Sequence, residues 1–553
     1  MKIVIYQIFT RLFGNKNLTR KPNGTYTDNG SGKMNDITPA VLQRIKALGV
    51  THVWLTGIIR HASTTDYSHH GIPTQHPAVV KGRAGSPYAI TDYYDIDPDI
   101  AEDVDRRMDE FEALIARVHR AGLKVIIDFV PNHVARQYKS VCKPKGTVDL
   151  GENDDTNMHF CTANDFYYCW GQPLEASVDM KGEADEPYTE MPAKATGNDR
   201  FDNHPGLYDW YETVKLNYGI DYCDAGGRSY HFSPIPDVWD KMTDILLFWS
   251  AKGVDGFRCD MAEMVPTAFW AWATDKVKYR CHDKIFIAEV YNPSQYRDYV
   301  AAGFDYLYDK VGMYDCVRGV ICGNRSAADI TYQWQATDDI KQHILYFLEN
   351  HDEQRIGSAF FAGDGQRGVP GLIVSALLGQ NPFMLYFGQE FGEPGMDNEG
   401  FSGIDGRTSI FDYWTVDTVY RGFFNRRKMR KEERETERIY TKVLNIAISE
   451  KAVGEGEFHD LMYVNRHLQR DVFAFIRKKD EEMLLVAVNF SDTDIKCSVN
   501  IPRNAFDCLW IGEGMHEAKD LLSEDKQVFL LKSDNPVEMT IPSQGGRVWK
   551  INM

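Results

Sequence analysis

Short apolar runs alternate with amphipathic segments over most of the 553-residue chain. Each run is rich in β-branched and aromatic residues and soon gives way to polar ones, which is typical of a buried strand. Strands are predicted at residues 2–9, 51–57, 123–130, 254–258, 285–290, 304–307, 344–348 and 383–387. Helical periodicity predicts helices at residues 39–48, 108–121, 238–251 and 266–279. Eight strands with intervening helices predict an α/β fold, a closed parallel (β/α)8 TIM barrel, and not an open sheet.

Two stretches depart from this alternation. Residues 134–234 contain no clear strand–helix unit, and a stretch of about 100 residues is too long for a bare loop. We therefore expect a small inserted domain after the third strand, with the barrel formed by residues 1–133 and 235–455. The last predicted helix, residues 417–439, precedes a C-terminal domain at 456–553, which is expected to be an antiparallel β-sandwich. Its alternating segments are residues 471–477, 483–489, 496–501, 528–531 and 547–551.

Composition excludes several classes of function. The chain has 80 acidic and 62 basic side chains and a formal charge of −18, so phosphate backbones would be repelled and no nucleic-acid partner is expected. No stretch approaches the roughly 20 apolar residues that a bilayer requires, and the first residues have the pattern of a strand, not of a leader. The ten cysteines lack the close pairs of a zinc site. We expect a cytoplasmic protein with free thiols and no membrane partner.

Charged and polar side chains follow four of the predicted strands. The strand ends read DFVPNH at 128–133, GFRCD at 256–260, AEV at 288–290 and ENHD at 349–352. Active sites of such barrels lie at the C-terminal ends of the strands. Any one of these residues could simply cap a strand or the next helix. Several acids on one rim repel one another, however, and such repulsion is typical of a functional site.

These residue types suit cleavage of a glycosidic bond. A carboxylate can attack the anomeric carbon while a protonated carboxylic acid gives its proton to the leaving oxygen. An arginine two residues before the nucleophile lies on the same strand face and can hold that carboxylate ionised. Neighbouring carboxylates and partial desolvation favour a protonated acid near neutral pH. Two such groups about 5 Å apart would give retention of anomeric configuration.

The four segments, in this order, resemble the signature regions of the α-amylase family, glycoside hydrolase family 13. The inserted domain and the C-terminal β-domain are also similar to the family's arrangement, so the resemblance covers nearly the whole chain. It implies that Asp260 is the nucleophile, Glu289 the general acid/base and Asp352 the transition-state stabiliser. It also implies that Arg258 orients Asp260, Asp128 supports Arg258, His133 and His351 bind sugar hydroxyls, and Tyr88 in the segment 85–93 forms an aromatic platform.

The resemblance leaves the metal open. Many family members bind calcium through the Asn equivalent to Asn132 and a His four residues after the nucleophile. That second position is Met264 here, which is a poor ligand for a cation that prefers oxygen. Glu263 also stands where starch-cleaving members often have Lys. We expect no required cofactor: Asn132 is either a calcium ligand or only a hydrogen-bonding partner of the inserted domain. The loop 15–36 lacks a calcium-loop pattern and is expected to be solvated.

Weaker cues concern the substrate. The segment VKLN at 214–217 resembles the family's fifth region, in a form closer to neopullulanases and cyclomaltodextrinases, which implies short maltooligosaccharides. The segment 388–394 also resembles the family, and the aromatic stretch 166–170 either stacks on glucose or forms the core of the inserted domain. We expect a retaining hydrolase of α-1,4-glucans or maltooligosaccharides. A transglycosylase or isomerase would use the same intermediate, whereas a non-catalytic glucan-binding protein would be expected to lack a catalytic carboxylate, and none is missing.

Overall fold

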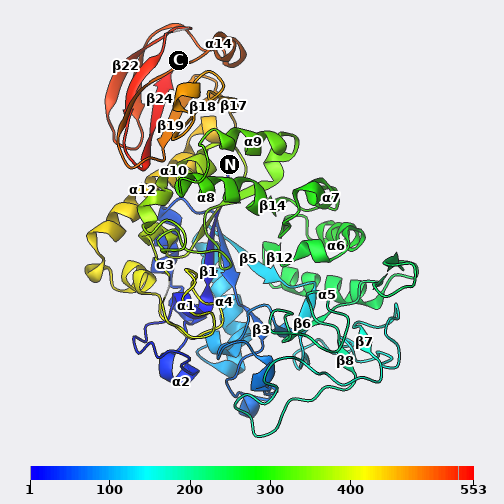
Figure 1. The fold of residues 1–553 in the computed structure, drawn as a ribbon. Helices are drawn as coiled ribbons and strands as arrows, with labels where there is room; N and C mark the ends of the chain where they lie inside the picture. Colours follow the sequence, from blue (N-terminus) through cyan, green and yellow to red (C-terminus); the bar gives the residue numbers. More distant parts are fainter. Residues whose placement is uncertain (1, 396, 534) are drawn as a thin grey trace.

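The computed structural model describes residues 2–395, 397–533 and 535–553, and its centre is a closed parallel barrel of eight strands (Figure 1). Around the barrel the order is β1-β16-β15-β14-β13-β12-β5-β2. The strands are β1 (Val4–Phe9), β2 (His52–Thr56), β5 (Lys124–Phe129), β12 (Gly256–Cys259), β13 (Ile285–Ala288), β14 (Tyr306–Tyr308), β15 (Ile344–Phe347) and β16 (Phe383–Tyr386). All eight predicted barrel strands, and closure of the sheet, are confirmed.

Inward-facing side chains change character along the barrel axis. The buried inner layer consists mainly of Ile5, Trp54, Ile126, Ile287, Leu345 and Met384. Two residues further along their strands come Gln7, Thr56, Asp128 and Glu289, all buried and polar. Because side chains alternate across a strand, these polar residues point to the same interior as the apolar layer below them. The polar cluster therefore lies next to the apolar layer, at the C-terminal end of the barrel strands.

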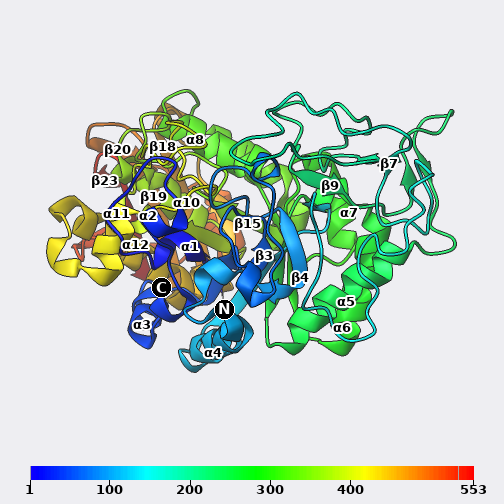
Figure 2. The ribbon, with the colours of Figure 1, turned by 90° about the horizontal axis from the view of Figure 1, so that it is seen from below.

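Helices surround the barrel (Figures 1 and 2). They are α3 (Pro39–Ala47), α4 (Arg107–Arg120), α5 (Asp237–Ala251), α6 (Thr267–Arg280), α7 (Tyr296–Ala301), α8 (Asp315–Ile321), α9 (Asp329–Ala336), α10 (Val369–Leu377) and α12 (Lys431–Ser449). Short helical turns are α1 (Thr10–Phe13), α2 (Tyr26–Asn29), α11 (Asp417–Val419) and α13 (Lys451–Gly454). The four helices predicted between the strands are confirmed.

The single helix predicted at 417–439 is wrong. The chain forms α11 and a π-helical turn at Tyr420–Phe424, leaves helical geometry at Asn425 (φ −143°, ψ 57°) and begins α12 only at Lys431. The wide turn lies against the Phe391 ring, which would be 2.2 Å from a Cβ on Gly422. The apolar periodicity continued across this break because both pieces pack on the same part of the barrel.

Most residues of the N-terminal loop 15–36 are exposed or half-buried, in agreement with its prediction as a solvated segment, but two of its asparagines are buried. Asn15 and Asn29 are buried, and their side-chain amides donate to the backbone oxygens of Trp414 and Tyr413, both at 2.9 Å. These hydrogen bonds hold the loop against a segment almost 400 residues later in the chain. Their role is therefore internal hydrogen bonding.

Between β5 and β12 the chain forms only short strands: β6 (His133–Ala135), β7 (Tyr168–Cys169), β8 (Ala193–Lys194), β9 (Thr213–Lys215), β10 (Ile220–Asp221) and β11 (Ser229–Tyr230). The antiparallel β6–β9 pair places His133 opposite Lys215. A separate pair, β3 (Ile59–His61) and β4 (Ile90–Ile96), leads toward the barrel rim. Figures 1 and 2 show the segment between β5 and β12 at the opposite end of the molecule from the C-terminal strands.

The C-terminal part is antiparallel β-structure, as predicted. A six-stranded sheet has the order β17-β18-β19-β24-β21-β22, and β20 pairs with β23 beside it. The strands are β17 (Glu457–Asp460), β18 (Val472–Lys479), β19 (Glu482–Asn489), β20 (Ile495–Val499), β21 (Gly514–Asp520), β22 (Lys526–Leu531), β23 (Val537–Ile541) and β24 (Gly545–Asn552), with α14 (Arg503–Leu509) after β20. The sheet packs through β19 and β24 on α10 of the barrel.

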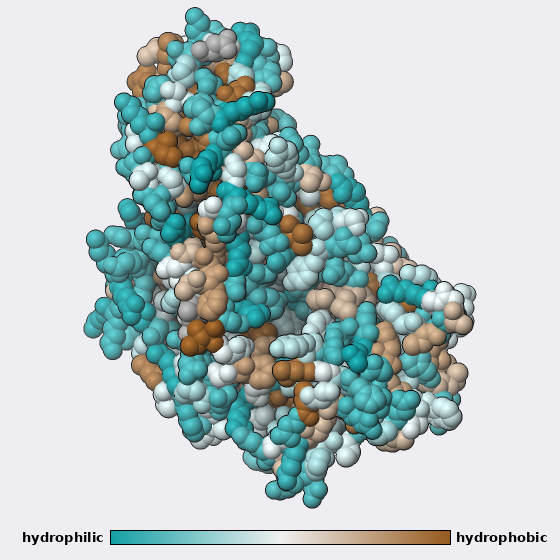
Figure 3. Space-filling model, viewed as in Figure 1, coloured by the Kyte–Doolittle hydropathy of each residue, from teal (hydrophilic) through white to brown (hydrophobic). Residues whose placement is uncertain are grey.

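The surface in Figure 3 is mainly hydrophilic, with hydrophobic residues scattered in small groups. Within the described residues, every helix is too short or too polar to cross a bilayer. All ten cysteines lie in the described part of the chain and are unpaired.

Candidate active site

The guanidinium of Arg258 is the centre of the polar cluster. On β12 it stands opposite Asp128 of β5 in the strand register. Its Nη1 lies 2.7 Å from Asp260 Oδ1 and 3.4 Å from Asp128 Oδ1, and its Nη2 lies 2.8 Å from Glu289 Oε2. Although burial opposes its charge, Glu289 and the other groups around it hold the pKa of Arg258 well above its ordinary value. One permanently charged group therefore contacts three carboxylates.

Asp260 and Glu289 follow directly after neighbouring strands. Glu289 is fixed from two further sides, because Met261 N donates to Oε2 and Tyr291 Oη donates to Oε1, each at 2.7 Å. Burial raises the pKa of Asp260 well above its ordinary value, with Arg258 opposing and the nearby Glu289 adding to the rise. The Arg258 guanidinium therefore bridges Asp260 and Glu289.

Tyr88, His351 and Asp352 form a connected row beside this pair. The Tyr88 and His351 rings stack with centroids 5.1 Å apart, and Tyr88 Oη is 2.6 Å from His351 Nε2. Gln7 donates to His351 Nδ1 at 2.9 Å, so Nε2 bears the proton that faces Asp352 Oδ2 at 3.0 Å. Burial opposes ionisation of Asp352, but His351 and then Arg258 lower its pKa to about 2.

His133 is held in the neutral form. It lies on β6, is buried, and has its ring centroid 5.4 Å from that of Trp210. Burial, aided by the nearby charges of Lys215 and Lys81, lowers the pKa of His133 to about 3. A neutral imidazole has one donor and one acceptor nitrogen, which suits a sugar hydroxyl.

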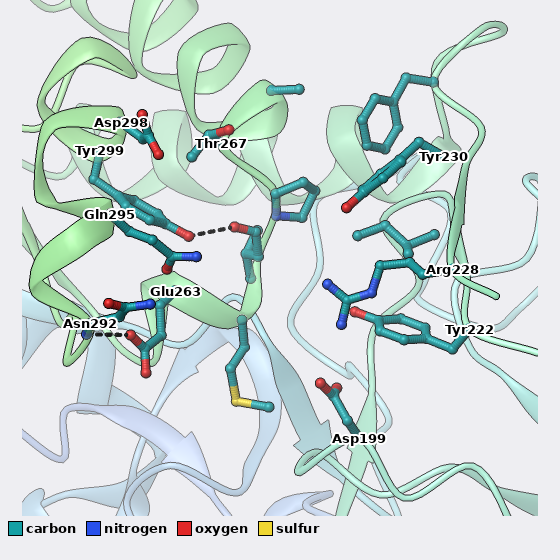
Figure 4. Close-up of a pocket in the computed structure, with 16 residues that line it drawn as sticks. Asp199, Tyr222, Arg228, Tyr230, Glu263, Thr267, Asn292, Gln295, Asp298 and Tyr299 are labelled. Atoms are coloured by element: carbon teal, nitrogen blue, oxygen red, sulfur yellow. Dashed lines mark hydrogen bonds between the residues drawn. The ribbon is translucent and has the colours of Figure 1, made fainter.

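One cavity is lined by these residues, and a second cavity is lined by residues of the segments that follow β12 and β13. Tyr88, His133, Asp260, Glu289 and Asp352 line one cavity of about 320 Å³, here called the catalytic pocket. A second cavity of about 520 Å³, here called the groove, is drawn in Figure 4. One wall of the groove bears Tyr222, Arg228 and Tyr230, and the facing wall bears Glu263, Asn292, Gln295 and Tyr299.

The backbone that follows Glu289 passes from the catalytic pocket to the groove. Glu263 Oε2 accepts hydrogen bonds from Tyr291 N (2.8 Å) and Asn292 N (3.1 Å). Tyr291 lines the catalytic pocket and Asn292 lines the groove. Glu263 is therefore a brace between the segments that follow β12 and β13.

The architecture and the cluster have counterparts among known proteins. Residues 7–445 match the catalytic domain of alpha amylase, and residues 463–552 match the alpha amylase C-terminal all-beta domain. The chain belongs to the alpha-amylase family. It is a hydrolase of that family. This agrees with the resemblance of the four strand ends.

Relatives within the alpha-amylase family are distant. Alpha-amylase 3 from Dictyoglomus thermophilum is 22% identical over 543 residues, which are 94% of this chain and 91% of that protein. Neopullulanase 2 from Thermoactinomyces vulgaris is 22% identical over 410 residues, 71% of this chain and 57% of that protein. The chain spans less than half the length of several other relatives. The acarbose-bound alpha-amylase from Geobacillus thermoleovorans shares the fold, with a TM-score of 0.66, 18% identity, and coverage of 100% of this chain and 98% of that one.

The site implied for calcium is filled by a lysine. Lys215 Nζ contacts Asn132 Oδ1, lies 2.7 Å from Asp199 Oδ1 and donates to Met264 O at 3.3 Å. The lysine is buried, which lowers its pKa, and Asp199 opposes that shift. The ammonium stands among these three oxygens, where a cation would otherwise bind, and calcium takes about six to eight oxygen ligands. The residues present therefore do not fit calcium. Asn132 also donates to Gly197 O at 2.7 Å, so its contacts agree with the second alternative, a hydrogen-bonding partner of the inserted domain.

Among the described residues, one group of three side chains has metal-ligand spacing: Asp92, Asp95 and Cys142. Arg60 lies 3.2 Å from Asp92 and 3.5 Å from Asp95, and Arg107 lies 2.7 Å from Asp95. Two guanidinium groups therefore already neutralise the two carboxylates. This arrangement indicates a structural ion-pair cluster.

The structure brings together all eight residues expected around the reacting sugar: Tyr88, Asp128, His133, Arg258, Asp260, Glu289, His351 and Asp352. The lining residues of the catalytic pocket that sequence reasoning missed include Lys81, Trp210, Glu212, Tyr291, Ile410 and Phe411. Tyr291 alone had a signal, as an aromatic residue two positions after Glu289. In the stretch 166–170, Phe166 and Tyr167 are buried, whereas Trp170 is exposed.

Proposed function

We propose that the protein is a retaining glycoside hydrolase that cleaves mainly α-1,4 bonds of maltooligosaccharides or related α-glucans. The main support is the contact of one guanidinium, that of Arg258, with both Asp260 and Glu289 at 2.7 and 2.8 Å. The guanidinium favours an ionised Asp260, as a nucleophile requires, and it fixes the orientation of both carboxyl groups. A nucleophile and an acid are thus present side by side.

The first half of the reaction forms a bond to the protein. An Asp260 oxygen attacks the anomeric carbon of the donor glucose, and the bond from that carbon to the leaving oxygen breaks. Glu289 gives its proton to the leaving oxygen. Tyr88 supports the apolar face of the ring, and Asp352 and His351 hold ring hydroxyls as positive charge develops on the sugar.

The second half regenerates the enzyme. Glu289, now ionised, takes a proton from water, and the water oxygen displaces Asp260 from the anomeric carbon. Arg258 and Asp128 keep the leaving Asp260 carboxylate in place. Two inversions at one carbon give net retention. Ten unpaired cysteines support a reducing, cytoplasmic setting for this enzyme.

A transglycosylase or isomerase is the alternative, because a sugar hydroxyl can replace water in the second step. The groove favours this candidate, since Tyr222 and Tyr230 offer aromatic faces to an acceptor sugar, and Asn292 of the facing wall is three residues after Glu289. The intermediate on Asp260 is common to both reactions. They differ only in which hydroxyl reaches the sugar.

The test is the product profile from maltoheptaose, with reducing ends counted and Asp260→Asn as the inactive control. Hydrolysis gives shorter oligosaccharides and a rise in reducing ends that the variant does not show. Redistribution of chain lengths at a constant number of reducing ends would support the transglycosylase instead. An Asp260→Asn variant as active as the unmodified enzyme would falsify the assignment of the nucleophile.

A further inference from the structure

The catalytic pocket contains a buried ion pair that the proposed chemistry does not use. Lys81 Nζ lies 2.7 Å from Glu212 Oε1, and the two side chains are only 14% and 5% exposed. Both residues line the same cavity as Asp260, Glu289 and Asp352. Together with Trp210, Ile410 and Phe411, which also line it, they form what is here called the donor wall.

One carboxylate oxygen of Glu212 has no hydrogen-bond donor among the described residues. Within the described part of the chain, Glu212 Oε2 is buried and accepts no hydrogen bond. A buried carboxylate oxygen without a donor is unfavourable in a free protein and is a strong acceptor for a ligand hydroxyl. Lys81, beside it, has further ammonium protons to donate. The pair is therefore suited to bind two hydroxyls of a sugar.

The donor wall is fixed in place from behind. Arg11 is buried and donates to Ala84 O (2.7 Å), Gly85 O (3.1 Å) and Ile410 O (2.6 Å). These bonds tie the segment that contains Lys81 to the segment that contains Phe411. The two segments also meet directly, because Ala84 N donates to Phe411 O at 3.0 Å.

Close packing at Gly82 strengthens the same junction. Gly82 has a φ of +64°, and a Cβ there would lie 2.3 Å from Phe411 O. On its other side the segment is held to the inserted residues by the ion pair of Arg83 with Glu183 at 2.6 Å. Opening the donor wall would require breaking several of these contacts at once.

The two cavities differ in what they can accept. The groove in Figure 4 is lined by Asn292, three residues after Glu289, the group that protonates the leaving oxygen. We therefore assign the leaving part of the chain to the groove. The donor sugar then lies on Tyr88, with its far end against the donor wall. The catalytic pocket, at about 320 Å³, is at the small end of ligand pockets, which span about 300–1,000 Å³.

We propose that the Lys81–Glu212 pair closes the donor side of the site and binds hydroxyls of the non-reducing chain end. The enzyme then removes short units from that end, and it does not cut within a longer chain. The inference rests on the proposed function and deepens it. It makes Lys81 and Glu212 specificity-determining residues that recognise a chain terminus.

The experiment compares two maltoheptaoses, one free and one with an acetal joining O4 and O6 of its non-reducing glucose. We expect the unmodified enzyme to cleave the free sugar and to act on the blocked sugar more slowly by about 100-fold or more. With a label at the reducing end, the first labelled product from the free sugar should be only one or two units shorter. Labelled fragments from the middle of the chain at the earliest times would overturn the proposal.

Variants connect this selectivity to the pair. The double variant Lys81→Ala/Glu212→Ala removes both charges together and opens the wall, so the preference for the free sugar should fall below about 10-fold. The double variant Lys276→Ala/Asp240→Ala is the matched control, since it removes an exposed ion pair between α6 and α5 that lines neither cavity; its preference should stay at that of the unmodified enzyme. Activity on the free sugar shows that each variant is folded.

The outcomes distinguish failure of the closed donor side from failure of the proposed hydrolase function. Equal rates on both sugars would overturn the closed donor side and leave the hydrolase intact. A double variant with undiminished selectivity would overturn the role of the pair. If neither sugar is cleaved, the proposed function fails and the inference falls with it.

Discussion

Arg258 Nη1 lies 2.7 Å from Oδ1 of Asp260, two residues further along the same strand end. Lysine cannot reproduce the planar fork that also contacts Glu289. We expect Arg258→Lys to lower kcat on maltoheptaose by about 100-fold. Steady-state kinetics with far-UV circular dichroism as the check on folding would test this. A kcat within a factor of about two of the unmodified enzyme would contradict it.

A smaller substitution at Tyr291 tests the positioning of Glu289. Its hydroxyl donates to Glu289 Oε1 at 2.7 Å, and Tyr291→Phe removes that donor while keeping the ring. Because this hydrogen bond positions the carboxyl group that transfers the proton, we expect kcat to fall by about 10-fold. Tyr332→Phe, a change at an exposed tyrosine on α9, is the matched control and should have no effect. Equal rates for both variants would exclude a positioning role for Tyr291.

The buried Lys215 ammonium is expected to stabilise the folded protein. Lys215→Met leaves Asn132 and Asp199 without their cationic partner, and we expect a loss of about 3 kcal/mol in the free energy of unfolding, measured with urea. Lys194→Met, a change at a less buried lysine of the inserted residues, should cost less.

The smaller variant Lys215→Ala makes room for a cation among oxygens that it prefers. Its Tm should rise when calcium is added, whereas that of the unmodified enzyme should stay constant. A calcium-dependent Tm in the unmodified enzyme would show that the lysine does not replace the metal.

The buried carboxyl group of Glu390 should make the free energy of unfolding depend on pH. It is fully buried, accepts from Tyr6 Oη at 2.5 Å, and burial raises its pKa from 4.5 to about 8. Between these values the unfolded chain releases a proton that the folded protein keeps, so stability falls as pH rises from about 4.5 toward 8. Glu390→Gln removes this slope. We expect the variant to be more stable by on the order of 3 kcal/mol at pH 8 and equal at pH 4, by urea unfolding at each pH. Parallel stability profiles for the two proteins would refute the prediction.

The barrel strands and the polar residues at their ends were predictable because both follow local patterns. A buried strand such as β5 is a continuous β-branched run, and Asp128 follows it directly. The break before α12 was not predictable in this way, because it depends on the Phe391 ring that packs against Gly422. In the C-terminal domain, strands β17, β21 and β23 were missed. The residues of β17 and β21 alternate poorly between apolar and polar types, whereas β23 alternates regularly and is short.

The donor wall was beyond sequence reasoning for a related reason. Lys81, Glu212 and Phe411 lie on loops, where no periodicity indicates which side chain faces inward. Their proximity depends on Arg11, whose three carbonyl partners are distant in the chain. Lys215 likewise stood in a recognised segment, yet only its contact with Asp199 shows why a lysine is there.

The donor wall is assembled from three loops, and none of them contains Asp260, Glu289 or Asp352. Insertions, deletions or exchanges in those loops can therefore change the length of the released product while the bond-breaking residues at the strand ends stay untouched. Product size and reaction type are encoded in separate parts of this chain. Natural divergence and protein engineering can thus alter one without disturbing the other.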